Sequence, residues 1–167
     1  YAYYLLALCY YDQIIDETKD MQRIVDAEKY FKIVVNNYQN SEYAIDAEYK
    51  LDYIEEILAS KEMYLARYYV QREKWIPAIN RFKIVVETYD NTIFIEEALH
   101  RLVELNYKIG LEDEAKKYAT VLGYNYQSSE WYDQTYKIFN KNYKKISKKK
   151  TANKKNKFIQ KFKELLK

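Results

Sequence analysis

The sequence predicts an all-α fold in which antiparallel helix pairs stack as a repeat solenoid, and three observations support this prediction. The 167 residues include only two glycines and one proline. Almost no segment alternates polar and apolar residues as a half-buried β-strand would. The segment FKIVV occurs at 31–35 and again at 82–86, and other apolar and turn positions also coincide at this offset. Such internal similarity is typical of stacked units that share one core.

The first predicted helix covers residues 1–15. Residues 1–11 have no charged side chain, and a helix that is apolar on every side must be covered on every side. We therefore expect at least one further repeat ahead of this helix, which would make the sequence a fragment without its N-terminus. A polar loop is predicted at 16–20, and a second helix at 23–38.

The longest predicted helix covers about 42–72. Ser41 is its expected N-cap, and apolar residues then recur at three- and four-residue spacing with no glycine or proline before residue 77. Pro77 is expected in the first turn of the following helix, where the missing N–H costs nothing. That helix is predicted to end near Tyr89.

Two glycines are expected to end the next two helices. Gly110 follows a helix predicted at 93–109, and Gly123 follows one at 112–122. Both would adopt the positive φ that is common just past a helix. The small and large residues between Leu102 and Ala119 match those of a tetratricopeptide unit. The predicted division is repeats over 1–127 (about 1–39, 41–90 and 92–123), a capping helix at 128–146, and a Lys-rich tail at 147–167 in which 156–166 have amphipathic helical spacing.

No residues suited to catalysis, metal binding or cofactor binding are expected. His100 is the only histidine and Cys9 the only cysteine, too few for a His-based metal site or a Ser-His-Asp triad. Cys9 is expected to be a small buried apolar residue. Neighbouring carboxylates such as Glu55 and Glu56 are expected on solvated helix faces. We therefore expect a protein that is not an enzyme and needs no metal or cofactor.

The net charge of +3 conceals an asymmetry along the chain. Residues 134–167 hold 13 lysines and one acidic residue, whereas the rest hold 15 basic and 24 acidic residues. The tail is interpreted first as a solvated segment. It could also contact anionic lipid head groups through 156–166, or dock on an acidic partner or on this protein's own acidic body. Nucleic-acid binding is not expected, because aromatic residues are not interleaved with the basic run.

Longer runs of sequence indicate a particular family. These are LASKEMYLARYYVQREKWIPAINRFKIVVETYDNT at 58–92, EEALHRLVELNYKIGLEDEAKKYATVLGYNY at 96–126, and SEWY at 129–132. With them, residues 1–133 resemble the last three of five repeats in the BamD family, the YfiO-type outer-membrane assembly lipoproteins of Gram-negative bacteria. The first two repeats and the lipid-bearing cysteine of that family are not in this sequence, and Cys9 does not match that cysteine.

The resemblance implies a non-catalytic scaffold on the periplasmic face of the outer membrane, within the machinery that folds and inserts β-barrel proteins. It implies docking on the membrane-proximal POTRA domain of BamA, the barrel subunit, together with contact to other subunits and to nascent outer-membrane proteins. The corresponding partner-binding residues would be Arg81 and Asn80 of the AINRF segment and Arg67 of ARYY, because a guanidinium grips a carboxylate through two hydrogen bonds. Without the resemblance, Arg81 is interpreted as a solvated residue that pairs within its own repeat. The alternative function is a cytosolic tetratricopeptide adaptor that binds extended peptides.

Overall fold

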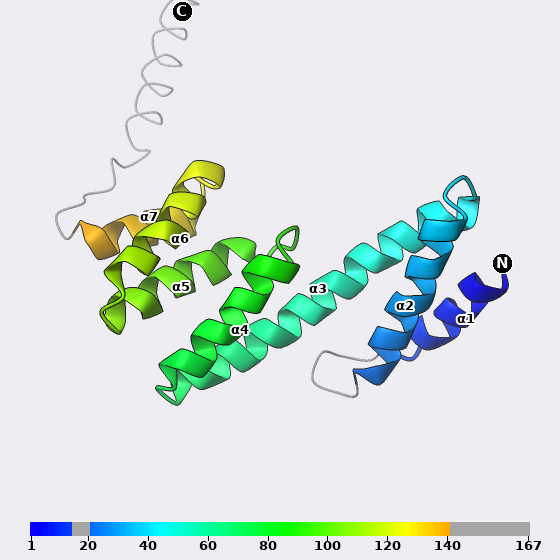
Figure 1. Ribbon diagram of the computed structural model, residues 1–167, viewed down its shortest axis with the longest axis horizontal. Coiled ribbons are helices and arrows are strands. Elements are labelled where there is room, and N and C mark those ends of the chain that lie inside the picture. Colours follow the sequence, from blue (N-terminus) through cyan, green and yellow to red (C-terminus); the bar gives the residue numbers. More distant parts are fainter. Residues whose placement is uncertain (15–20, 141–167) are drawn as a thin grey trace, which may run out of the picture.

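The computed structural model describes residues 1–14 and 21–140, and every regular element in these ranges is an α-helix (Figure 1). The helices are α1 (Ala2–Tyr11), α2 (Gln22–Asn37), α3 (Glu42–Gln71), α4 (Trp75–Thr88), α5 (Ile95–Lys108), α6 (Glu112–Asn125) and α7 (Glu130–Phe139). Consecutive helices pack as the pairs α1–α2, α3–α4 and α5–α6, and α7 rests on α5 and α6. The prediction of an all-α helical solenoid is confirmed.

The long helix and its caps agree with the sequence prediction. Helix α3 runs from Glu42 to Gln71, and the Ser41 Oγ accepts a hydrogen bond from the Ala44 N–H at 3.2 Å. Pro77 lies in the first turn of α4. The first helix is shorter than predicted, because α1 ends at Tyr11 and residues 12–14 form a turn. The predicted loop at 16–20 lies outside the described residues.

The two glycines have different roles. Gly110 has φ +87° just past α5, as predicted for a residue that ends a helix. Gly123 does not end a helix, because α6 continues to Asn125, so that prediction is wrong. A Cβ placed on Gly123 would lie 3.1 Å from Cε2 of Tyr132 in α7. Position 123 is therefore small because two helices approach closely there.

The repeated segment supplies equivalent positions of two separate cores, rather than of the one shared core that the repeat predicted. Phe31 and Val34 of the first copy are buried between α1, α2 and the N-terminal half of α3. Phe82 and Val85 of the second copy are buried between the C-terminal half of α3, α4 and α5. Helix α3 thus contributes Ala47 and Ile54 to the first core, and Met63 and Ala66 to the second. Its buried face changes direction along its length.

Two side chains differ from their predicted surroundings. Cys9 is exposed rather than buried, because its side of α1 is not covered by the helices of the described ranges. Glu56 is not simply solvated: its Oε1 accepts a hydrogen bond from the Ile93 N–H at 3.1 Å, and its Oε2 is buried. This carboxylate fastens the turn before α5 to the middle of α3, which adjacency in sequence could not reveal.

The C-terminal segment is described only in part. Helix α7 lies within the predicted capping segment 128–146. Residues 141–167, with the Lys-rich tail at 147–167 and the predicted amphipathic helix at 156–166, lie outside the described residues. Among the helices that are described, none is long and apolar enough to cross a membrane.

Candidate docking surface on helix α4

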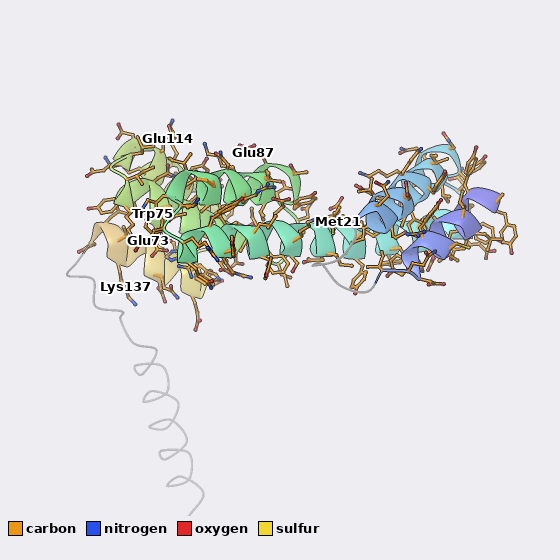
Figure 2. The ribbon with its side chains drawn as sticks, turned by 90° about the horizontal axis from the view of Figure 1, so that it is seen from below. Met21, Glu73, Trp75, Glu87, Glu114 and Lys137 are labelled. Carbon is orange, nitrogen blue, oxygen red and sulfur yellow. The ribbon has the colours of Figure 1, made fainter. Side chains whose placement is uncertain are left out.

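Helix α4 presents one buried and one exposed side. Ala78, Phe82 and Val85 are fully buried, whereas Ile76 is 58% exposed and Asn80 is also exposed. This follows from the helical period, which places residues three and four apart on the same side. Figure 2 labels Trp75 and Glu87, which mark the two ends of α4. The buried side of α4 anchors the helix in the core, and its exposed side remains accessible to a partner.

The N-terminal end of α4 is held firmly. Glu73 adopts a left-handed φ of +55° in the turn between α3 and α4, and the Lys74 N–H donates to the Tyr69 carbonyl oxygen at 2.9 Å. Trp75 packs against the second core, and the Lys108 Nζ lies 3.8 Å from its ring centroid, a cation–π contact. These contacts fix the position of α4 relative to α3 and α5.

Arg81 lies at the border between the two sides of α4, since one residue corresponds to about 100° of helix rotation. Its Nη1 donates to both carboxylate oxygens of Glu62 in α3, at 2.9 Å to Oε2 and 3.3 Å to Oε1. The Arg81 side chain is 37% exposed and that of Glu62 is 16% exposed. Within residues 1–14 and 21–140, the Arg81 side chain has no other hydrogen-bond partner, so its Nε and Nη2 remain available.

Arg67 is bound in a different manner. Its Nε donates to Glu97 Oε1 at 3.1 Å, and its Nη2 donates to Glu97 Oε2 at 2.6 Å. This is the side-on bidentate geometry of a strong arginine–carboxylate pair. Glu97 also lies 3.8 Å from Nε of Arg101, one turn further along α5. Arg67 therefore ties α3 to α5 with the edge of its guanidinium that best grips a carboxylate.

The three predicted partner-binding residues are thus separated in two groups. Asn80 and Arg81 are neighbours on α4, and the exposed side chain of Asn80 has no hydrogen bond to any described residue. Arg67 is engaged by α5 instead. Sequence reasoning missed Glu62, which lies 19 residues before Arg81 on the paired helix. The signal that could have found it is the antiparallel α3–α4 hairpin, which brings such positions side by side.

A hollow of about 350 Å³ lies beside the middle of α3 and is lined in part by the acidic residues Asp52, Glu55 and Glu56. Burial raises the pKa of Glu55, and the negative charges of Asp52, Glu28 and Asp90 act in the same direction, against Lys32. The hollow is therefore a region of negative potential. No group of three or more His, Cys, Asp or Glu side chains in the described ranges could hold a metal ion.

His100 is part of the helix packing. It is buried in α5, and its Nδ1 lies 2.7 Å from the Thr135 Oγ1 of α7. Its ring lies 5.2 Å from that of Trp131. Burial lowers the pKa of His100, which favours the neutral ring at pH 7. These contacts join α7 to α5, and the side chain lines neither the α4 surface nor the acidic hollow.

Comparison with known proteins adds to this geometry. The sequence model of the YfiO family, described as an outer membrane lipoprotein, matches residues 1–122. The chain is 46% identical over 143 residues to the outer membrane protein assembly factor BamD of Rickettsia prowazekii, covering 86% of this chain and 57% of that protein. It is 43% identical over 142 residues to the assembly factor BamD of Caulobacter vibrioides, covering 85% of this chain and 47% of that protein.

A third relative, the assembly factor BamD of Neisseria gonorrhoeae, is 39% identical over 83 residues, which cover 50% of this chain and 31% of that protein. The chain spans about half the length of the first two curated relatives. These matches confirm the resemblance drawn from the 58–92 and 96–126 runs. The chain belongs to the YfiO family of outer membrane lipoproteins.

Proposed function

We propose that this chain is the docking part of a non-catalytic scaffold subunit in the outer-membrane β-barrel assembly machinery. The observation that carries the proposal is the 46% identity over 143 residues to a protein named as an outer membrane protein assembly factor. Further support comes from the solenoid itself, whose stacked helices are well suited to hold partner proteins in register. The work of this subunit would be to help fold and insert outer-membrane proteins by binding partners.

The proposed docking site is the exposed side of α4, with Arg81 as its central residue and Asn80 beside it. The partner would be a POTRA domain of BamA that offers a carboxylate. Support comes from the half-exposed Arg81 guanidinium, whose Nε and Nη2 have no partner among the described residues. Exposed Ile76, one turn before Asn80 on α4, adds apolar surface. Arg67 would contribute at most indirectly, by holding α5 against α3.

The proposed location is the periplasmic face of the outer membrane, with a lipid anchor in the full-length protein. Contacts with further assembly subunits and with nascent outer-membrane proteins belong to the same proposal. The family description as an outer membrane lipoprotein supports the location. The relatives described above give no support to the cytosolic peptide adaptor.

The decisive experiment is a calorimetric titration of this chain with the periplasmic domains of BamA from the same organism. It is carried out at two salt concentrations, with the full chain and with a variant lacking 140–167. Saturable binding that survives the deletion is expected, because the proposed site lies on α4. Absence of binding by a chain shown to be folded by circular dichroism would overturn the proposal and favour a peptide adaptor.

A further inference from the structure

The Arg81–Glu62 pair uses a single terminal nitrogen of the guanidinium. Glu62 receives hydrogen bonds only from Nη1, at 2.9 Å and 3.3 Å. The neighbouring Nε and Nη2 form the edge that places two parallel N–H groups opposite one carboxylate. Arg67 uses that edge for Glu97. On Arg81 the same edge has no partner in the part of the chain that the structure describes.

Both members of the pair stand on fixed backbone. Glu62 precedes Met63, which is fully buried in the second core, and Arg81 precedes Phe82, which is fully buried in the same core. The Glu62 side chain is only 16% exposed. The carboxylate is therefore a fixed acceptor, and it restricts the otherwise long and mobile arginine side chain to a small set of rotamers.

We propose that Glu62 is a positioning residue, which holds Arg81 by Nη1 so that its Nε–Nη2 edge is presented to a carboxylate of the docking partner. The inference rests on the proposed function. A partner carboxylate can bind at that edge without displacing Glu62, so one arginine bridges two carboxylates. The Arg81 side chain is already ordered before docking, so it loses less conformational freedom when the partner binds.

Charge acts against this effect. The Glu62 carboxylate repels a partner carboxylate across the guanidinium, and this repulsion weakens as salt is added. The geometric restraint on Arg81 depends much less on salt. We therefore expect the benefit of Glu62 to be clearest at high ionic strength. A role of Glu62 as a competitor that must release Arg81 would give the opposite result, namely tighter binding when Glu62 is removed.

The test measures affinity for the periplasmic domains of BamA at about 0.05 and 0.5 M salt. We expect Glu62→Ala to weaken binding by about three- to tenfold at the higher salt, the scale of ordering one long side chain, and by less at the lower salt. Glu62→Gln keeps an acceptor oxygen and should retain most of the affinity. The loss should disappear in an Arg81→Ala background, because no guanidinium is left to position.

Two controls separate positioning from damage to the fold. Glu104→Ala removes another arginine–glutamate pair, away from α4, in which Arg101 Nη1 lies 2.7 Å from Glu104 Oε2 within α5, and should leave affinity unchanged. The thermal midpoint of the free Glu62→Ala chain should lie within a few degrees of the unmodified chain. If Arg81→Ala weakens docking but Glu62→Ala leaves it unchanged or tighter, the positioning role is overturned and the docking proposal stands. If Arg81→Ala has no effect, the docking site itself fails.

Discussion

The junction of α3 with α4 and the junction of α3 with α5 contain the same kind of ion pair in two different forms. Each joins an arginine to a glutamate on a neighbouring helix, and each glutamate is mostly buried. At the α5 junction, Arg67 gives Nε and Nη2 to Glu97. At the α4 junction, Arg81 gives only Nη1 to Glu62. The two arginine side chains are similarly exposed, at 44% for Arg67 and 37% for Arg81, so they differ mainly in which edge of the guanidinium is occupied. If the docking proposal is right, that edge decides which arginine can bind a partner.

The largest expected effect comes from reversing the charge of Arg81, whose Nε–Nη2 edge has no partner among the described residues. Arg81→Glu should weaken binding to the periplasmic domains of BamA by about 2 to 5 kcal/mol, because a partner carboxylate would then face a carboxylate. A charge reversal of that partner residue should partly restore affinity in the calorimeter. An unchanged affinity for Arg81→Glu would remove Arg81 from the interface and erase the distinction between the two junctions.

A smaller loss of affinity is expected when the positive charge at position 81 is kept but the planar guanidinium is replaced by an ammonium. Arg81→Lys should weaken binding by about 1 to 2 kcal/mol, since an ammonium cannot hold Glu62 and also grip a second carboxylate through two parallel bonds. Arg67→Lys is the matched control and should leave affinity unchanged. If both lysine variants lost the same affinity in this titration, the occupied guanidinium edge would not explain which arginine binds the partner.

Replacing Arg67, whose Nε–Nη2 edge is occupied by Glu97, should lower stability and leave partner binding unchanged. Arg67→Ala removes both hydrogen bonds to Glu97, and we expect the free energy of unfolding to fall by about 1 kcal/mol, the upper range for a partly exposed pair. Urea denaturation followed by circular dichroism measures this loss. Partner affinity at a temperature where the variant stays folded should be unaltered, and a clear loss there would place Arg67 in the interface.

The smallest effect concerns the junction of α5 with α7, which contains no arginine pair of this kind. Burial lowers the pKa of His100 in the folded chain, so the unfolded chain binds a proton first as the pH falls below about 6.5. The stability that neutral His100 contributes is therefore fully present above that pH and is lost as the pH falls further. Between pH 7 and 6 the free energy of unfolding should fall by less than about 1 kcal/mol. His100→Gln should abolish the His100 contribution to this pH dependence. If the free energy of unfolding fell as much in that variant, His100 would not be its source.

Local rules predicted the helices well. The spacing of apolar residues and the Ser41 cap predicted α3, and the two FKIVV copies predicted equivalent buried positions at Phe31 and Phe82. Gly123 was predicted wrongly, because a glycine that ends a helix and a glycine that admits a neighbouring ring look alike in sequence. The distinction depends on the packing of Tyr132 from α7.

The candidate site was less predictable than the fold. Sequence reasoning singled out Asn80, Arg81 and Arg67 through family resemblance, but could not say which guanidinium edge each arginine uses. That property depends on rotamers and on the distance between paired helices. For the same reason Glu62 was missed and Glu56 was wrongly predicted to be solvated, since each contacts a residue on a distant part of the chain.

Helix α3 gives this protein a mechanical property. Its 30 residues correspond to about 45 Å of continuous helix, and its two ends are built into different cores (Figure 1). Such a helix acts as a lever arm without a hinge. A tilt of about 10° at the end beside α2 would carry the end beside α4 through about 8 Å, from the length of the helix. If α3 stays straight, a rotation of the first core would therefore displace the second core.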